Sequence, residues 1–211
     1  MSAVFNNPLL SSAYLPPAEY FFVLANSNGA TIEYCETFQK QSYRNRCNIY
    51  ATDGPFTLHV PVCHSERRLA PISETRIDYS RNWVHQHEIA LISAYRSSPF
   101  FEYYWDGFKA ILHSKPELLV DLNTQLTKKL LEEFNIGCEL RYSSEYLKNP
   151  EGPDLRNTIH PKNKEDNLMK KNGAEKPYYQ VFSARFGFIS NLSAIDLLFN
   201  EGPQACDYLT F

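Results

Sequence analysis

The common phosphate-binding and hydrolase motifs are missing from this chain of 211 residues, which contains 8 glycines. No glycine-rich loop is followed by Lys and Ser or Thr, and no GxGxxG follows a predicted strand. HExxH and GxSxG do not occur either. These absences disfavour a nucleotide kinase, a dinucleotide-dependent oxidoreductase, a zincin and an α/β-hydrolase.

Cysteines are few and show no paired spacing. There are 5, an odd number, and no CxxC occurs, so we expect no disulfide framework. Cys63 stands beside His64, but without a second pair at metal-ligand spacing this is weak support for zinc, and we expect no metal site. A Cys–His hydrolase stays open, because 5 cysteines and 6 histidines leave many pairings.

Long apolar runs and an excess of either charge are also missing. No run approaches the roughly 20 residues that span a bilayer, and the first fifteen residues lack the basic start and apolar core of a secretory signal. The net charge of −3 gives no general attraction to nucleic acid. We therefore expect a cytoplasmic, bacterial-type protein with no nucleic-acid partner and no transmembrane segment. The pattern does not indicate an oligomeric state.

The first half of the chain carries strand signals. Residues 19–26 and 30–38, separated by the turn signal "NSNG", are predicted to be neighbouring strands. Residues 46–52 and 56–62 flank Asp53–Gly54 and alternate apolar with polar positions, which predicts a β-hairpin. A further strand is expected over 74–80.

Helical periodicity begins after residue 81. Trp83, His87, Leu91 and Tyr95 share one helical face, and further helices are predicted over 100–114 and 117–137. Strands are expected over 138–144 and 178–190, and a short helix over 191–203, ended by Gly202. Segregated strands and helices indicate a single α+β domain over 1–211, with a β-rich N-terminal half, two or three central helices, and a C-terminal strand and short helix. The polar segment 148–177 is interpreted as either disordered or a functional loop.

A cluster of cations precedes the predicted hairpin. If residues 43–50 form a strand, Arg44 and Arg46 project from one face, with Lys40 nearby. Two guanidinium groups on one face repel unless an anion lies between them. That anion is either a structural carboxylate, from Glu33 or Glu36, or the phosphate or carboxylate of a ligand.

Two further groups of residues allow a structural and a functional interpretation. His87 faces inward on its helix, so it is either a hydrogen-bonded core residue or a catalyst that needs an orienting partner and an open pocket. Asp154, Arg156, His160 and Lys162 lie in the polar segment, where charge accumulates through solvation as well as through function.

Several blocks, in this order, resemble one family. They are "YLPPAEYF" (14–21), "ETFQKQSYRNRCNIYATDG" (36–54), "LHVPV" (58–62), then Trp83, His87 and "ISAYRSSPFFEYY" (92–104). "DLR…IHPK" and "YYQVF…FGFISNLSAIDLLFNEGP" resemble the ending of a branch typical of Bacteroidetes-like bacteria. Together the blocks reach across nearly the whole chain and resemble the WbqC-like proteins.

The resemblance implies a role in bacterial surface-polysaccharide (O-antigen) biosynthesis, with acyl- or aminoacyl-type transfer to an amino sugar. It specifies no cofactor, and it leaves the acyl or nucleotide-linked donor open. A cysteine at position 47 is not general to the family, so Cys47 is not expected to be a nucleophile. The positions that match the family pattern are Lys40, Arg44, Asn45, Arg46 and His87, with Arg156 and Lys162 from the branch-specific segment.

Two hypotheses follow. In the first, the protein is a transferase: the basic residues hold an anionic small molecule such as a nucleotide sugar or acyl donor, Asn45 orients a polar group, and His87 accepts a proton. In the second, it is a non-catalytic accessory or binding protein of the same pathway, and His87 is a core histidine. The first hypothesis requires Arg44, Arg46 and His87 to meet at one open cleft.

Overall fold

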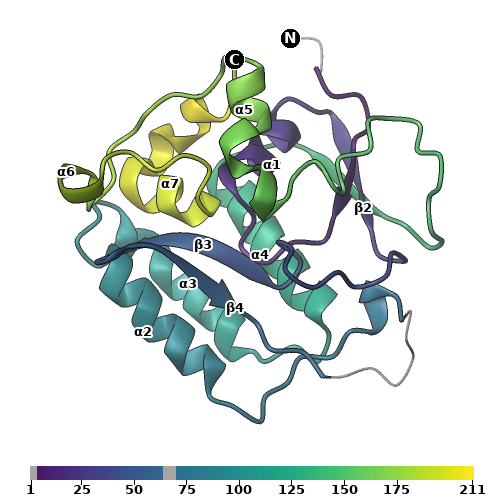
Figure 1. Ribbon diagram of the computed structural model, residues 1–211, viewed down its shortest axis with the longest axis horizontal. Coiled ribbons are helices and arrows are strands. Elements are labelled where there is room, and N and C mark those ends of the chain that lie inside the picture. Colours follow the sequence, from purple (N-terminus) through teal and green to yellow (C-terminus); the bar gives the residue numbers. More distant parts are fainter. Residues whose placement is uncertain (1–3, 64–69) are drawn as a thin grey trace.

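The computed structural model describes residues 4–63 and 70–211 (Figure 1). Strands and helices are mixed along the chain, as expected for the α+β class. The strands are β1 (Leu9–Ser11), β2 (Gly29–Glu33), β3 (Arg46–Ala51), β4 (Gly54–His59) and β5 (Glu139–Tyr142). The α-helices are α1 (Ala18–Ala25), α2 (Trp83–Tyr95), α3 (Phe101–His113), α4 (Leu119–Glu133), α5 (Leu168–Lys171), α6 (Ser183–Phe186) and α7 (Ala194–Glu201). Short 3₁₀ helices are η1 (Ile72–Glu74), η2 (Pro161–Asp166) and η3 (Gly202–Tyr208).

A small parallel sheet has the order β1-β2-β5, and Leu9 of β1 also bridges in parallel to Asp154. Parallel neighbours need a crossover connection, and α1 supplies it between β1 and β2. The prediction of a strand over 19–26 was therefore wrong. The residues of α1 from Ala18 to Leu24 are all buried, so the segment has no polar face whose period could identify a helix.

The predicted β-hairpin is confirmed. β3 and β4 pair antiparallel, with Arg46 opposite His59 at one end and Ala51 opposite Gly54 at the turn. Gly54 has φ +107°, a conformation that glycine adopts at little cost. Figure 1 shows the hairpin across the middle of the molecule, with α2 and α3 packed below it and α1, α5 and α7 above.

The three central helices are confirmed as α2, α3 and α4, and α7 is confirmed with Gly202 at its C-cap. The expected strand over 74–80 is absent. That stretch contains the end of η1 and two isolated bridges, Val62 to Ile77 and Arg76 to Leu118. Residues 178–190 form the short helix α6 within irregular chain instead of the expected strand.

The polar segment 148–177 is attached to the rest of the fold. Its few apolar side chains are placed where they can be buried: Leu155, Ile159, Leu168 and Met169 all belong to the core cluster. The bridge from Leu9 to Asp154 and the helices η2 and α5 give the segment local structure. The composition alone does not predict this attachment. The apolar residues that anchor the segment occur singly along it, so the segment is polar on average.

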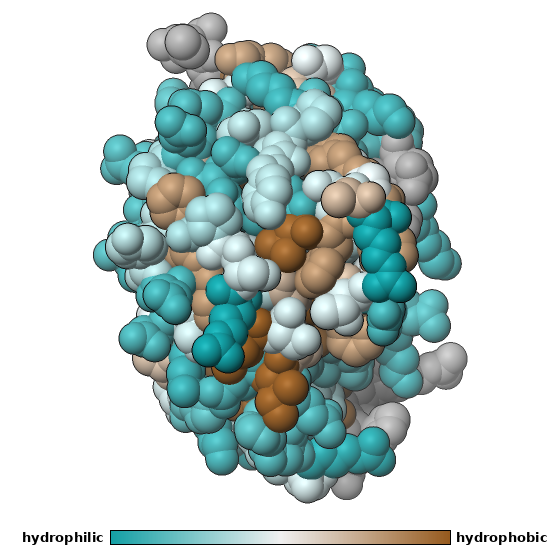
Figure 2. Space-filling view, turned by 90° about the vertical axis from the view of Figure 1, so that its left-hand side faces the viewer, coloured by the Kyte–Doolittle hydropathy of each residue, from teal (hydrophilic) through white to brown (hydrophobic). Residues whose placement is uncertain are grey.

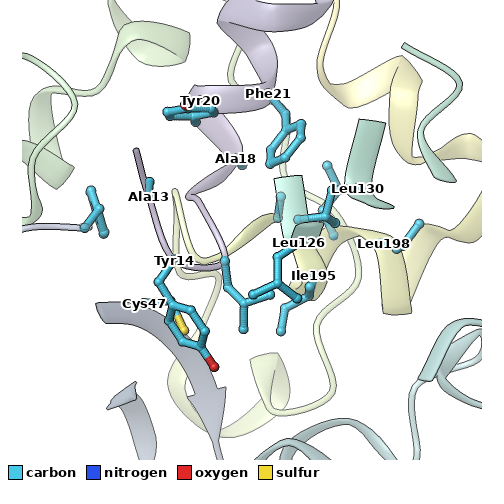
Figure 3. Packing of buried hydrophobic residues seen from close by; sticks show 14 of the residues in the cluster. Ala13, Tyr14, Ala18, Tyr20, Phe21, Cys47, Leu126, Leu130, Ile195 and Leu198 are labelled. Carbon is cyan, nitrogen blue, oxygen red and sulfur yellow. The ribbon is translucent and has the colours of Figure 1, made fainter. Parts of the chain in front are cut away.

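One continuous hydrophobic cluster runs through the described residues. Figure 3 shows Tyr14 lying beside Cys47 of β3, on the side of the cluster away from Phe21. The cluster therefore joins the segment after β1 to the hairpin. On the face shown in Figure 2, polar residues predominate and apolar residues gather in small groups near its centre.

Candidate functional site

A cleft of about 720 Å³ lies at the end of the hairpin opposite its Asp53–Gly54 turn. Its walls come from the chain before β3, from the paired ends of β3 and β4, and from the chain on either side of η1. The lining residues are Thr37, Phe38, Lys40, Gln41, Asn45, Arg46, His59, Pro61, Val62, Cys63, Ala70, Glu74, Thr75 and Arg76. The cleft thus gathers three of the predicted residues: Lys40, Asn45 and Arg46.

Cations dominate the charge of the cleft, since Lys40, Arg46 and Arg76 face one carboxylate, Glu74, among the described lining residues. Arg76 pairs with Glu117 at 2.6 Å on the exposed surface. Within the described part of the chain, Lys40 and Arg46 make no ion pair, and Nε of Arg46 is buried without a hydrogen-bond partner. A buried guanidinium donor without a partner is costly, and an anionic ligand would satisfy it.

Arg44 is placed elsewhere. It lies in the turn before β3, so the alternation that would put it on the same face as Arg46 does not apply. Its side chain is 2% exposed and donates two hydrogen bonds from one edge of the guanidinium to the Glu36 carboxylate, Nε to Oε1 at 2.8 Å and Nη2 to Oε2 at 2.5 Å. Burial raises the pKa of Glu36, and the bond to Arg44 opposes that shift. Glu36 was one of the two structural partners that the sequence offered.

Arg156 also has carboxylate partners. It pairs with Asp154 at 2.6 Å and with the fully buried Glu33 at 3.2 Å, and its guanidinium lies over the Tyr146 ring. The hydrogen bond to Asp154 raises the pKa of Arg156, and the same bond lowers the pKa of Asp154. These contacts tie the polar segment to β2, and Arg156 does not line the cleft.

Lys162 and His160 approach the arginines from the polar segment. His160 is half-buried, and its pKa is lowered first by burial and then by the charges of Lys162, Arg44 and Arg46. The Lys162 side chain is exposed and forms no ion pair within the described ranges. Of the two predicted cations of the polar segment, Arg156 is thus bound to carboxylates, and Lys162 is an exposed charge near His160.

His87 is a buried histidine on α2. Its exposed fraction is 4%, and its Nδ1 lies 2.9 Å from the Tyr14 hydroxyl. Burial is the main cause that lowers its pKa to about 4, while a hydrogen bond to the His59 backbone acts in the opposite direction. His87 does not line the cleft, so the structure does not bring Arg44, Arg46 and His87 together in one open site.

Sequence reasoning missed His59. It is the last residue of β4 and stands opposite Arg46, the first residue of β3, so the two side chains share a face of the hairpin. Its Nε2 lies 2.8 Å from Nδ2 of Asn45. Burial, then the charge of Arg46, lowers the pKa of His59. The alternation of buried Leu58 and Val60 already placed His59 on the outer face, which was the available signal.

The described residues contain no group of three or more His, Cys, Asp or Glu side chains that could hold a metal ion, and His64 lies outside them. Across the described ranges, no helix has the length and apolar character needed to cross a bilayer.

Comparison with known proteins gives one family and one curated relative. The WbqC-like protein family matches residues 11–181. An uncharacterised protein of Mycobacterium tuberculosis, Rv1507c, is 26% identical over 227 residues, covering 96% of each chain. No solved structure matches the chain. The matched family range includes the cations of the cleft, His59, His87 and the segment with Arg156 and Lys162.

Proposed function

Since the chain belongs to the WbqC-like protein family, we propose that it is a transferase of bacterial surface-polysaccharide (O-antigen) biosynthesis that binds an anionic small molecule in its basic cleft. The family is associated with polysaccharide biosynthesis. The proposed ligand is a nucleotide sugar or an acyl donor such as an acyl-coenzyme A, both of which carry phosphate groups.

Two cations of the cleft that form no ion pair among the described residues carry this proposal. Lys40 and Arg46 stand in a concave site of about 720 Å³, within the size range of small-molecule pockets. Arginine binds phosphate oxygens through two parallel N–H donors, and lysine adds a point charge. Arg76 adds a further cation to the lining of the same cleft.

The proposed reaction is acyl- or aminoacyl-type transfer to an amino sugar. The amine nitrogen bonds to the acyl carbon, the bond from that carbon to the donor's leaving group breaks, and the amine proton leaves with that group. The cleft contributes by positioning both substrates and by stabilising negative charge on the leaving group. A direct proton-accepting role for His87 stays a prediction, and it requires an opening that exposes this buried ring.

The burial of His87 favours the second candidate function, a non-catalytic accessory protein that binds the same anionic ligand. In that case His87 is a core histidine bonded to Tyr14, as its contacts allow. Both candidate functions require the cleft to bind an anion. They differ only in whether the bound substrate is converted to product.

Thermal unfolding tests the binding step. Inorganic pyrophosphate, a UDP-linked amino sugar and acetyl-coenzyme A are added separately to the protein and to a Lys40→Ala plus Arg46→Ala variant. A ligand at about 100 times its Kd stabilises the fold by about 2.7 kcal/mol, or roughly 5–11 °C for a chain of this length. We expect at least one anion to stabilise the parent and not the double variant.

Arg185→Ala is the matched control, because Arg185 is an exposed arginine on α6, outside the cleft. This variant should retain the full stabilisation. If no anion stabilises the parent, the cleft is not an anion site. Mass spectrometry of a mixture with an amino sugar and an acyl donor then separates the candidates, since only a transferase yields the acylated sugar.

A further inference from the structure

The orientation of the Asn45 side chain is fixed by a backbone group. Its amide nitrogen, Nδ2, lies 2.8 Å from the carbonyl oxygen of Val60. A carbonyl oxygen can only accept a hydrogen bond, so the amide atom that faces it must be the NH₂ group. The same Nδ2 lies 2.8 Å from Nε2 of His59 and donates its second hydrogen there.

This bond determines the protonation state of His59. Nε2 accepts a hydrogen from Asn45, so it carries none itself, and a neutral imidazole must then carry its hydrogen on Nδ1. If Nε2 of His59 carried a proton, two hydrogen-bond donors, this Nε2–H and the NH₂ group of Asn45, would face each other with no acceptor between them. Partial burial and the positive charge of Arg46 also favour the neutral ring, since both lower the pKa of His59. Among the described lining residues, the other charged groups are Lys40, Arg76 and Glu74.

The His87 ring lies near the backbone of His59, because a hydrogen bond to that backbone is one of the causes that act on the pKa of His87. Nδ1 of His87 lies 2.9 Å from the Tyr14 hydroxyl. The Trp83 ring packs edge-on against the His87 ring, with 4.9 Å between the ring centroids. Buried side chains thus lie beside the strand end that carries His59.

We infer that His59 is the ligand-facing histidine of the cleft and that Asn45 holds it as the Nδ1–H tautomer, so that it donates a neutral hydrogen bond to the bound anion. The acceptor is a phosphate or carboxylate oxygen, and Arg46 lies opposite on the same face of the hairpin. His59 is not a general base through Nε2, because Asn45 occupies that nitrogen. The donor role rests on the proposed anion site, whereas the tautomer does not.

Nuclear magnetic resonance tests the tautomer without any ligand. Long-range ¹H–¹⁵N correlations of the uniformly labelled full chain at pH 7.5 report which ring nitrogen of each histidine is protonated. His59→Gln assigns the His59 signals by their loss. We expect His59 Nδ1 to be protonated and Nε2 to be unprotonated, the less common form of free imidazole. A protonated Nε2, or averaged signals from both forms, overturns the inference.

Affinity for inorganic pyrophosphate tests the donor role. Asparagine can place its amide nitrogen near the position of Nδ1, and glutamine places it near Nε2. His59→Asn should therefore bind pyrophosphate within about threefold of the parent, and His59→Gln should lose roughly tenfold or more, the value of one hydrogen bond to a charged group. Equal loss in both variants, or no loss in either, refutes the donor role. If the parent itself binds no anion, both the donor role and the proposed function fail. The resonance measurement still decides which tautomer His59 adopts.

Discussion

The buried pair of Arg44 and Glu36 separates a structural arginine from a ligand-binding one. Glu36→Gln removes the counter-charge of a guanidinium that is 2% exposed and donates two hydrogen bonds to that carboxylate. Loss of one partner of a buried ion pair leaves an uncompensated charge and costs about 3–5 kcal/mol. For a chain of this length each kcal/mol shifts Tm by about 2–4 °C, so the expected fall is roughly 6–20 °C.

The exposed pair of Arg76 and Glu117 is the matched control. Its N–O distance is 2.6 Å, but both side chains are 67% exposed. Solvent screens such a pair, so Glu117→Gln should cost less than about 1 kcal/mol. Urea unfolding of both variants at pH 7 and low salt gives the comparison. If Glu36→Gln costs no more than Glu117→Gln, Arg44 does not depend on Glu36, and its assignment as a structural cation fails.

Three further predictions concern pH and backbone strain. Burial holds the pKa of His87 near 4, below its ordinary value of 6.5, so its contribution to stability is complete above pH 6.5 and falls by up to about 3 kcal/mol toward pH 4. Burial raises the pKa of Asp196 from 3.8 to about 6, so its contribution has the opposite sign and is lost as pH rises through 6, also by about 3 kcal/mol. As the pH increases from 4 to 7, the urea midpoint of His87→Gln should therefore decrease, and the urea midpoint of Asp196→Asn should increase. Parallel profiles of the two variants would contradict both assignments. Gly202 has φ +56°, and a Cβ there would lie 2.5 Å from the Phe100 ring, so Gly202→Ala should cost more than about 1 kcal/mol in the same assay, whereas an unchanged midpoint would exclude this strain.

Local patterns predicted the elements that local interactions determine. The hairpin followed from the Asp53–Gly54 turn and the alternation around it, and α2 and α4 followed from their apolar stripes. The helix α1 could not be identified in this way. Its identity is set by the pairing of β1 with β2, a parallel contact that demands a crossover and that no window of neighbouring residues contains.

The candidate site shows the same division. The cation cluster in the sequence indicates Lys40 and Arg46, the family resemblance adds Asn45, and the structure places all three in the cleft. Arg44 was assigned to the face of Arg46 because the strand was expected to include it, but β3 begins two residues later. His59 is a single outward residue in its strand, and only the hairpin register sets it opposite Arg46.

The parallel sheet also constrains when the chain can fold during synthesis. β1 ends at Ser11, yet its neighbours include the segment at Asp154, and β2 pairs with β5 at Glu139–Tyr142. The sheet therefore cannot close until roughly three quarters of the chain has left the ribosome, at about 5–20 residues per second. The hairpin β3–β4 needs only its own residues and can form first. The strands β1 and β2 can pair early, but their outer partners at Asp154 and in β5 follow more than 100 residues later in the chain. This long-range pairing is expected to be the slow step of folding.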